Sequence, residues 1–119
     1  LYHTVAVIAC NYLVGLVGAA LEIAERIPIA RDEALRALLP LIQGTVANLS
    51  KQGIPHALTG PVARGDIHTI RDHLEILSLH CPDVLELYKV MGRHTLKLAQ
   101  SCGLATSIAQ ELEQLFASP

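Results

Sequence analysis

The sequence predicts an all-α domain, a bundle of about five to six helices. Apolar residues recur at helical spacing along most of the chain, no segment of useful length alternates with a period of two, and Pro and Gly separate the helical stretches. With 119 residues, of which 51% are hydrophobic and 17% charged, the chain can form its own core and is too apolar for disorder. We therefore treat residues 1–119 as a single domain.

The first predicted helix runs from about Tyr2 to Arg26. It ends before Pro28, because a proline disfavours helical geometry in the residue that precedes it. From Thr4 to Leu21 there are 18 positions without a charge, which is the lower limit for crossing a bilayer. The polar Asn11 inside this run, the acidic Glu22 after it and the lack of a Lys or Arg flank argue against a membrane span. We expect a helix buried on nearly every side, inside the bundle or between two subunits.

Four more helices are predicted, and most of their ends carry a signal. The second, Arg31–Lys51, stops at Gly53, and Pro40 should kink it or split it in two. Residues 53–65 form the longest irregular stretch. The last three helices are Ile67–His80, capped by Asp66, then Asp83–Ser101 and Thr106–Ala117. We expect these side chains to point inward: Leu35, Leu38, Leu39, Ile42, Val46, Leu49, Ile70, Leu74, Leu77, Val84, Leu87, Tyr88, Met91, Thr95, Leu98, Ile108, Leu112 and Leu115.

Two polar side chains interrupt the apolar first helix. His3, Val7 and Asn11 are spaced by four and so lie on one stripe. If the stripe faces a cleft, the imidazole of His3 can exchange a proton near neutral pH and the amide of Asn11 can orient a substrate oxygen. Alternatively, both groups are structural: Asn11 bridges to a neighbouring helix and His3 contacts backbone at the helix end.

The second candidate is the loop from Leu58 to Asp66, which resembles an anion pocket in composition. Gly60 lets backbone approach a ligand, Arg64 offers a forked cation suited to carboxylate or phosphate, and Thr59 and Asp66 add polar groups. The alternative is that Asp66 only caps the next helix, Thr59 satisfies a turn, and Arg64 pairs with Asp66 or lies in solvent.

Several other classes of function are disfavoured. The net charge of −2 and the absence of a block of Lys and Arg oppose nucleic-acid binding. The six histidines form no chelating pair one helical turn apart, so no metal is expected. Three cysteines without a Cys-x-x-Cys spacing fit a reducing cytoplasm better than a disulfide framework. The start at Leu1, inside an apolar pattern, indicates a piece cut from a longer chain.

A family resemblance rests on residues distributed along the chain in order. It is carried by Tyr2-His3-x-x-Ala6-Val7, Asn11-Tyr12-Leu13, Leu38-Leu39-Pro40-Leu41, the loop Leu58–Asp66, His73-Leu74 and Tyr88. These resemble the C-terminal helical domain of Rossmann-like oxidoreductases that is catalogued as domain of unknown function 2520. The arrangement of the two domains is similar to that of pyrroline-5-carboxylate reductase, ketopantoate reductase and the 6-phosphogluconate dehydrogenase group.

The resemblance implies a function for both candidate sites. Such a domain dimerises, here through the long first helix, and forms the substrate side of a cleft whose other wall holds NAD(P). His3 would then be the proton donor, Asn11 the orienting residue and Arg64 the anchor for a small anionic substrate, with Thr59, Gly60 and Asp66 in the same substrate loop. Cys10 departs from the serine expected there.

Because this chain has no strand and no Gly-x-Gly-x-x-Gly, it should hold no cofactor itself and be inactive alone. The competing hypothesis is a non-catalytic helical oligomerisation module, whose polar residues only fix the packing of helices.

Overall fold

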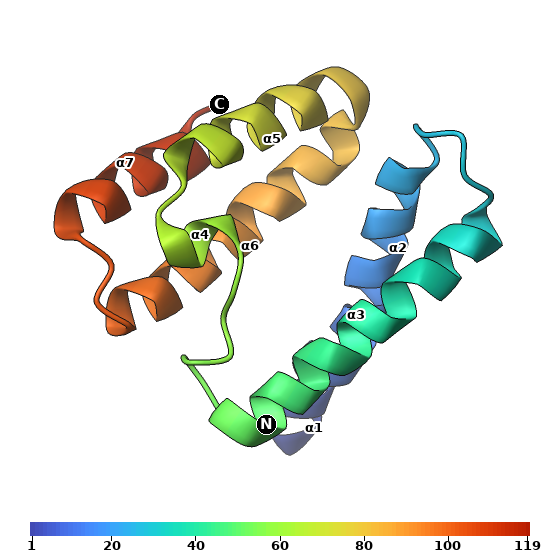
Figure 1. The fold of residues 1–119 in the computed structure, drawn as a ribbon, viewed down its shortest axis with the longest axis horizontal. Coiled ribbons are helices and arrows are strands. Elements are labelled where there is room, and N and C mark those ends of the chain that lie inside the picture. The colour runs from blue at the N-terminus through green and yellow to red at the C-terminus, as the bar shows by residue number, and fades with distance from the viewer. The chain divides into compact units, whose positions relative to one another are not determined.

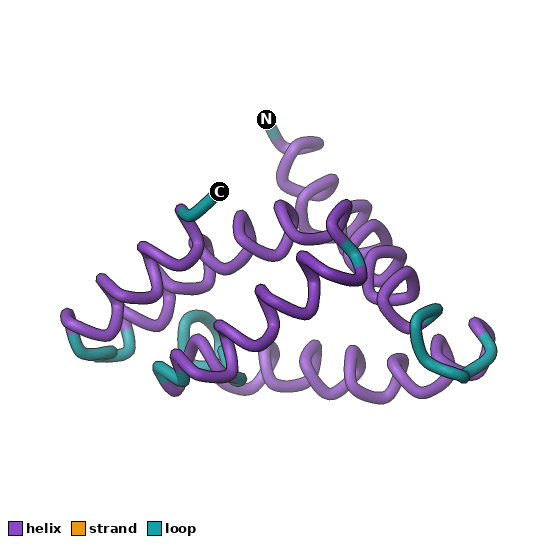
Figure 2. The backbone as a smooth tube through the Cα atoms, turned by 90° about the horizontal axis from the view of Figure 1, so that it is seen from above, coloured by secondary structure: helices purple, strands orange, loops and turns teal.

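The computed structural model describes residues 1–119 and contains helices but no strand (Figure 2). With Tyr2–Ala24 counted as one helix, there are six, which confirms the predicted all-α class. The chain forms two compact units, Leu1–Pro40 and Leu41–Pro119, and each is described by itself.

The first unit begins with the long apolar helix, which has three parts. An α-helical turn, α1 (Tyr2–Ala6), leads into a π-helical segment, η1 (Val7–Asn11), and then into α2 (Tyr12–Ala24) (Figure 1). The helix ends two residues before the predicted Arg26. The turn that follows contains an ion pair between Arg31 and Glu25, which are both about half exposed.

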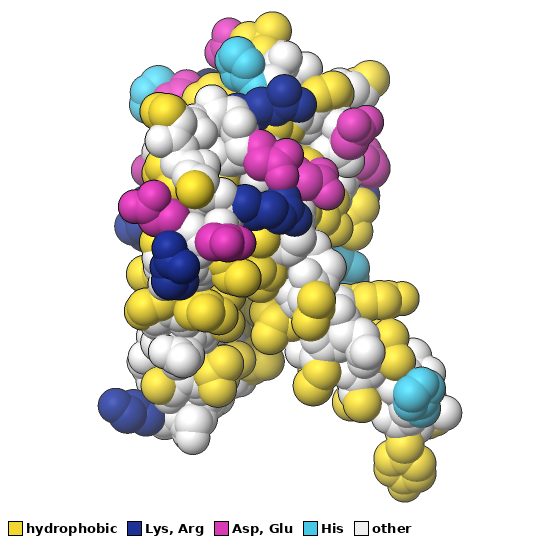
Figure 3. All heavy atoms as spheres, turned by 90° about the vertical axis from the view of Figure 1, so that its right-hand side faces the viewer, with side chains coloured by type: hydrophobic (Ala, Val, Ile, Leu, Met, Phe, Trp, Pro, Cys, Tyr) yellow, Lys and Arg dark blue, Asp and Glu magenta, His cyan; other side chains and the backbone are white.

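The predicted burial of this helix does not occur within the chain. Leu21 is its only buried residue, whereas Tyr2 is 94% exposed and Val14 is 73% exposed. Figure 3, which views the molecule from the right-hand side of Figure 1, shows many hydrophobic side chains at the surface. By length and composition alone, Tyr2–Ala24 is also the one helix that could cross a membrane. Cover by a second subunit stays a prediction.

The next helix, α3 (Arg31–Gln52), passes through Pro40 without being split. A proline inside a helix removes one backbone hydrogen bond, and the turns on either side can still hold the helix together. The boundary between the two units nevertheless falls directly after Pro40. The predicted apolar stripe is wrong in part, because Leu39, Val46 and Leu49 are exposed and Ala34 is the buried residue of α3.

The second unit contains the four remaining helices. After an irregular segment come the single turn α4 (Pro61–Arg64), α5 (Ile67–His80), α6 (Pro82–Ser101) and α7 (Thr106–Ala117). The bounds of α5 and α7 are those predicted, and α6 begins one residue earlier because proline is favoured at the first helical position. Only α4, inside the stretch expected to be irregular, was missed.

The core of the second unit lies among α4, α5, α6 and α7. Its largest fully buried side chains are Phe116, Ile70 and Leu112. Two predicted core residues of α6, Leu87 and Met91, are each 37% exposed. The buried residues of α6 instead include Gly92, against which the ring of Phe116 packs. The core cluster comprises Val62, Ile70, Leu96, Ala99, Ala109, Leu112 and Phe116.

Two cations of α6 hold the end of α7. The buried Lys89 donates from Nζ to the carbonyl oxygen of Ser118 at 2.6 Å, and Arg93 donates to the carbonyl oxygen of Phe116 at 2.8 Å. The last carbonyls of a helix lack partners within the helix and lie at the negative end of its dipole. Lys89 and Arg93 therefore fix the C-terminal end of α7 on α6.

Candidate functional site

The loop predicted to bind an anion is a tightly built turn. Gly60 precedes α4 with φ of 91°, Pro61 occupies the first helical position, and Gly65 ends α4 in the left-handed conformation with φ of 67°. The amide of Gly65 donates to the carbonyl of Val62 at 3.1 Å, and that of Asp66 donates to the carbonyl of Pro61 at 2.9 Å. This is the Schellman pattern, which requires a residue tolerant of positive φ at the position of Gly65.

Gly65 also lies against Leu104, in the segment that joins α6 and α7, and against Ile108 in the first turn of α7. A Cβ atom placed on Gly65 would lie 2.8 Å from Cγ2 of Ile108 and 2.9 Å from Cδ1 of Leu104. Two independent requirements, backbone conformation and space, thus call for glycine here. The C-terminal end of the loop therefore lies against two side chains that pack on the core of the second unit.

Asp66 caps α5, as the sequence predicted. Its Oδ1 accepts the backbone N–H of Thr69 at 3.1 Å, and its Oδ2 accepts the hydroxyl of Thr69 at 2.8 Å. Arg64 approaches the same carboxylate at 3.7 Å, and its side chain is 62% exposed. The bonds from Thr69, followed by the charge of Arg64, lower the pKa of Asp66. The structural roles that the sequence left open are therefore present, because Asp66 caps α5 and Arg64 pairs with Asp66. The exposed guanidinium of Arg64 is still accessible to a ligand.

The lowered pKa of Asp66 predicts how stability depends on pH. The stabilising contribution is complete above the ordinary value of 3.8 and is lost as the pH falls through the lower folded-state value. The variant Asp66→Asn keeps a capping oxygen but cannot titrate. We expect the wild type to be the more stable protein at pH 7 and the difference to shrink toward pH 2. Urea denaturation at several pH values measures this, and a constant difference would contradict it.

Thr59 is exposed at the start of the loop and borders a cavity of about 210 Å³. The cavity is mostly apolar. It is lined by Thr45, Leu49, Ile54, Pro55, Ala57, Leu58, Thr59 and Leu98. Thr59 and the Gly60–Asp66 turn thus belong to one short segment of the second unit.

His3 and Asn11 lie in the first unit, and both are exposed. The π segment between them affects their alignment. A spacing of four residues is slightly more than one turn of an α-helix, which has 3.6 residues per turn. The same spacing is slightly less than one turn of a π-helix, which has more residues per turn. The step from His3 to Val7 is largely α-helical and the step from Val7 to Asn11 is π-helical, so the two deviations oppose each other. His3 and Asn11 therefore share a face, as predicted, although no residue pattern predicts the π segment.

Other polar contacts join helices of the second unit. Arg71 of α5 pairs with Glu111 of α7 at 2.5 Å. Nδ1 of His73 and the hydroxyl of Tyr88 are hydrogen-bonded at 2.9 Å, and burial raises the pKa of Tyr88. Contacts between residues this far apart in sequence have no local signal.

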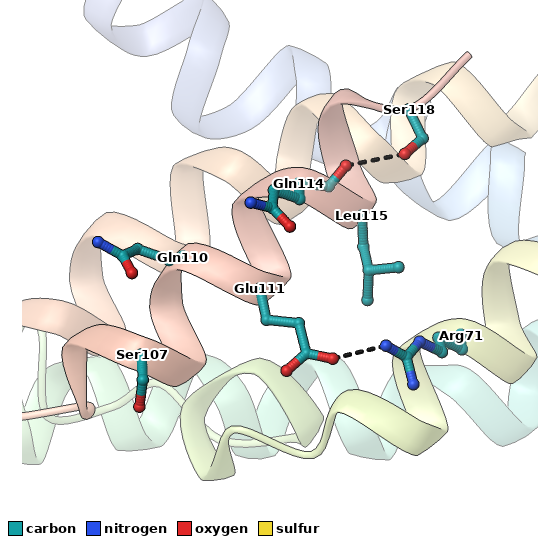
Figure 4. A pocket seen from close by; sticks show the side chains of 7 residues that line it. All are labelled: Arg71, Ser107, Gln110, Glu111, Gln114, Leu115 and Ser118. Atoms are coloured by element: carbon teal, nitrogen blue, oxygen red, sulfur yellow. Dashed lines mark hydrogen bonds and ion pairs between the residues drawn. The ribbon is translucent and has the colours of Figure 1, made fainter.

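Figure 4 shows the Arg71–Glu111 pair at the side of a polar depression of about 470 Å³ on α5 and α7. The two charged groups lie together at one edge of the depression, where they form this ion pair. Its lining residues are Arg71, Ser107, Gln110, Glu111, Gln114, Leu115 and Ser118. No group of three or more His, Cys, Asp or Glu side chains converges as a metal site would require.

Comparison with known proteins gives one match. The family model described as a domain of unknown function, DUF2520, matches residues 1–95, which is most of the chain and includes the first helix and the Leu58–Asp66 loop. No curated protein and no solved structure is similar enough to match. The chain therefore belongs to the DUF2520 family.

Proposed function

We propose that this chain is the dimerisation and substrate-binding domain of an NAD(P)-dependent oxidoreductase that acts on a small anionic metabolite. Membership of the DUF2520 family supports the proposal through the resemblance of that domain to the helical C-terminal domains of Rossmann-like oxidoreductases. The cofactor would belong to a separate dinucleotide-binding domain, because this chain has neither a strand nor a Gly-rich fingerprint to hold a pyrophosphate.

The observation that carries the proposal is the first helix. It exposes an uncharged surface along most of its length, and His3 and Asn11 lie on one face of it. A Cβ atom on Gly15 or Gly18 would meet nothing within 4 Å, so a second helix could approach the backbone closely there. A second copy of the chain that covers the apolar residues would leave the His3 and Asn11 face at the border of the interface.

In this proposal His3, Asn11 and Arg64 each have a role in the reaction. In a reduction of C=O or C=N, His3 would deliver the proton to the oxygen or nitrogen, and the Asn11 amide would donate a hydrogen bond that orients that atom. Arg64, with its exposed guanidinium, would pair with the carboxylate or phosphate of the substrate. The substrate class follows from this cation.

An Arg64→Ala variant of the full-length protein tests the assignment. We expect KM for the anionic substrate to rise about tenfold with kcat little changed, because an anchor that binds ground state and transition state alike contributes about 1.4 kcal/mol of uniform binding. NADPH oxidation with a panel of keto and imino acids measures both constants. Arg36→Ala, at an exposed cation of α3, is the control. An unchanged KM would remove Arg64 from the site.

The alternative is a non-catalytic oligomerisation module. The roles of Asp66 as a cap and of Gly65 in packing favour it, since both explain much of the loop without a ligand. The encoding gene discriminates between the two functions. An upstream strand-turn-helix segment rich in Gly supports the enzyme, and any other neighbour supports the module.

A further inference from the structure

A groove of about 420 Å³ runs along α6 and reaches α7 on the second unit. The floor includes Val90 and the buried Leu96, and the rest of the lining is polar. The α6 side carries Arg93, His94, Lys97 and Gln100, and the α7 side carries Glu113. Most of these residues lie beyond position 95, where the family match ends.

The polar side chains of this groove are largely without partners. The side chains of His94, Lys97, Gln100 and Glu113 make no ion pair and no hydrogen bond. Arg93 donates to the carbonyl of Phe116 and has only a loose pairing, at 3.8 Å, with the exposed Glu86. The polar depression of Figure 4 is different, because its arginine is already paired with Glu111.

The charge of the groove is opposite to that of the chain. Arg93 and Lys97 against Glu113 give a net charge of +1 with His94 neutral, whereas the whole chain has −2. Arg93 and Lys97 are one helical turn apart, so their charged groups can approach the same anionic group of a ligand. Gln100 adds an amide donor one further turn along α6.

We propose that this groove binds a small organic anion, a carboxylate or a phosphate monoester, through Lys97 and the free N–H groups of Arg93. Gln100 and His94 would complete the donors around the anion, and the apolar floor at Val90 and Leu96 would contact a short aliphatic part. Glu113 would accept a hydrogen bond from a hydroxyl or amino group on the ligand and would oppose an anion that carries neither. The site does not depend on the oxidoreductase proposal.

Titrations of the isotope-labelled chain with inorganic phosphate, succinate and malate, followed by backbone amide NMR at constant ionic strength, test this. We expect saturable shifts on α6 and α7. Lys97→Gln should weaken binding of all three about two- to fivefold, and Glu113→Gln should tighten phosphate and succinate by a similar factor. Malate should gain less from Glu113→Gln, because its hydroxyl exchanges a charged carboxylate acceptor for the weaker, neutral amide oxygen of glutamine. The ratio of phosphate to succinate affinity distinguishes the two anion classes.

Lys51→Gln and Glu33→Gln are the matched controls, since they make the same charge changes at exposed positions outside the groove. Both should leave the affinities as in the wild type. Absence of saturable shifts on α6 and α7, or equal effects of Lys97→Gln and Lys51→Gln, would overturn the proposal. Spectral dispersion shows that each variant is folded, so a loss of binding is not a loss of structure.

Discussion

Replacing Gly92 by alanine is expected to lower the free energy of unfolding by about 3 kcal/mol, near the upper end of overpacking costs. A Cβ atom on Gly92 would lie 2.4 Å from Cε1 and 2.5 Å from Cζ of Phe116. That ring is 1% exposed and belongs to the core cluster, so a shift that relieves the overlap must displace other core side chains. Urea denaturation of the two proteins measures the difference.

Gly44→Ala in α3 is the matched control for Gly92→Ala. Gly44 is also inside a helix, but a Cβ atom there would meet nothing within 4 Å. Alanine should therefore stabilise the protein by about 0.5–1 kcal/mol through helix propensity. Adding Phe116→Leu to Gly92→Ala should recover part of the lost stability. Equal effects of the two glycine variants would mean that Phe116 does not pack on Gly92.

The largest functional effect is expected from His3→Ala in the full-length protein. If His3 is the proton donor of the proposed reduction, kcat should fall by about 10²- to 10⁴-fold with KM little changed. The measurement is NADPH oxidation with the substrate that the panel identifies. His68→Ala is the control, because His68 is exposed on α5 and its only close partner is Asp72 at 3.5 Å. Equal turnover in wild type and His3→Ala would leave His3 without a catalytic role.

Local signals predicted the helices well, because the residues that end and begin them act through the adjacent backbone. Asp66 caps α5 and Pro82 begins α6, each within one turn of the residues it affects. Long-range packing was predicted less well. The apolar pattern of α6 favoured Leu87 and Met91 as core residues, and only the position of Phe116 in space shows why Gly92 is buried instead.

The candidate site was predictable to a similar extent. Gly65 and Asp66 have clear local roles, so the shape of the loop follows from its sequence. The hydrogen bond between His73 and Tyr88, and the pairing of Arg71 with Glu111, depend on how α5 meets α6 and α7. The exposure of the first helix could not be predicted, because an apolar pattern indicates burial without identifying the molecule that covers it.

The proposed function depends most on what covers Tyr2–Ala24. Sedimentation velocity of the full-length protein at micromolar concentration, in the absence of detergent, tests this directly. We expect a stable dimer, and we expect Gly18→Arg, which puts a charge on the exposed apolar helix, to convert it to a monomer. A wild-type protein that sediments as a monomer, or that is recovered only with membranes, would contradict it.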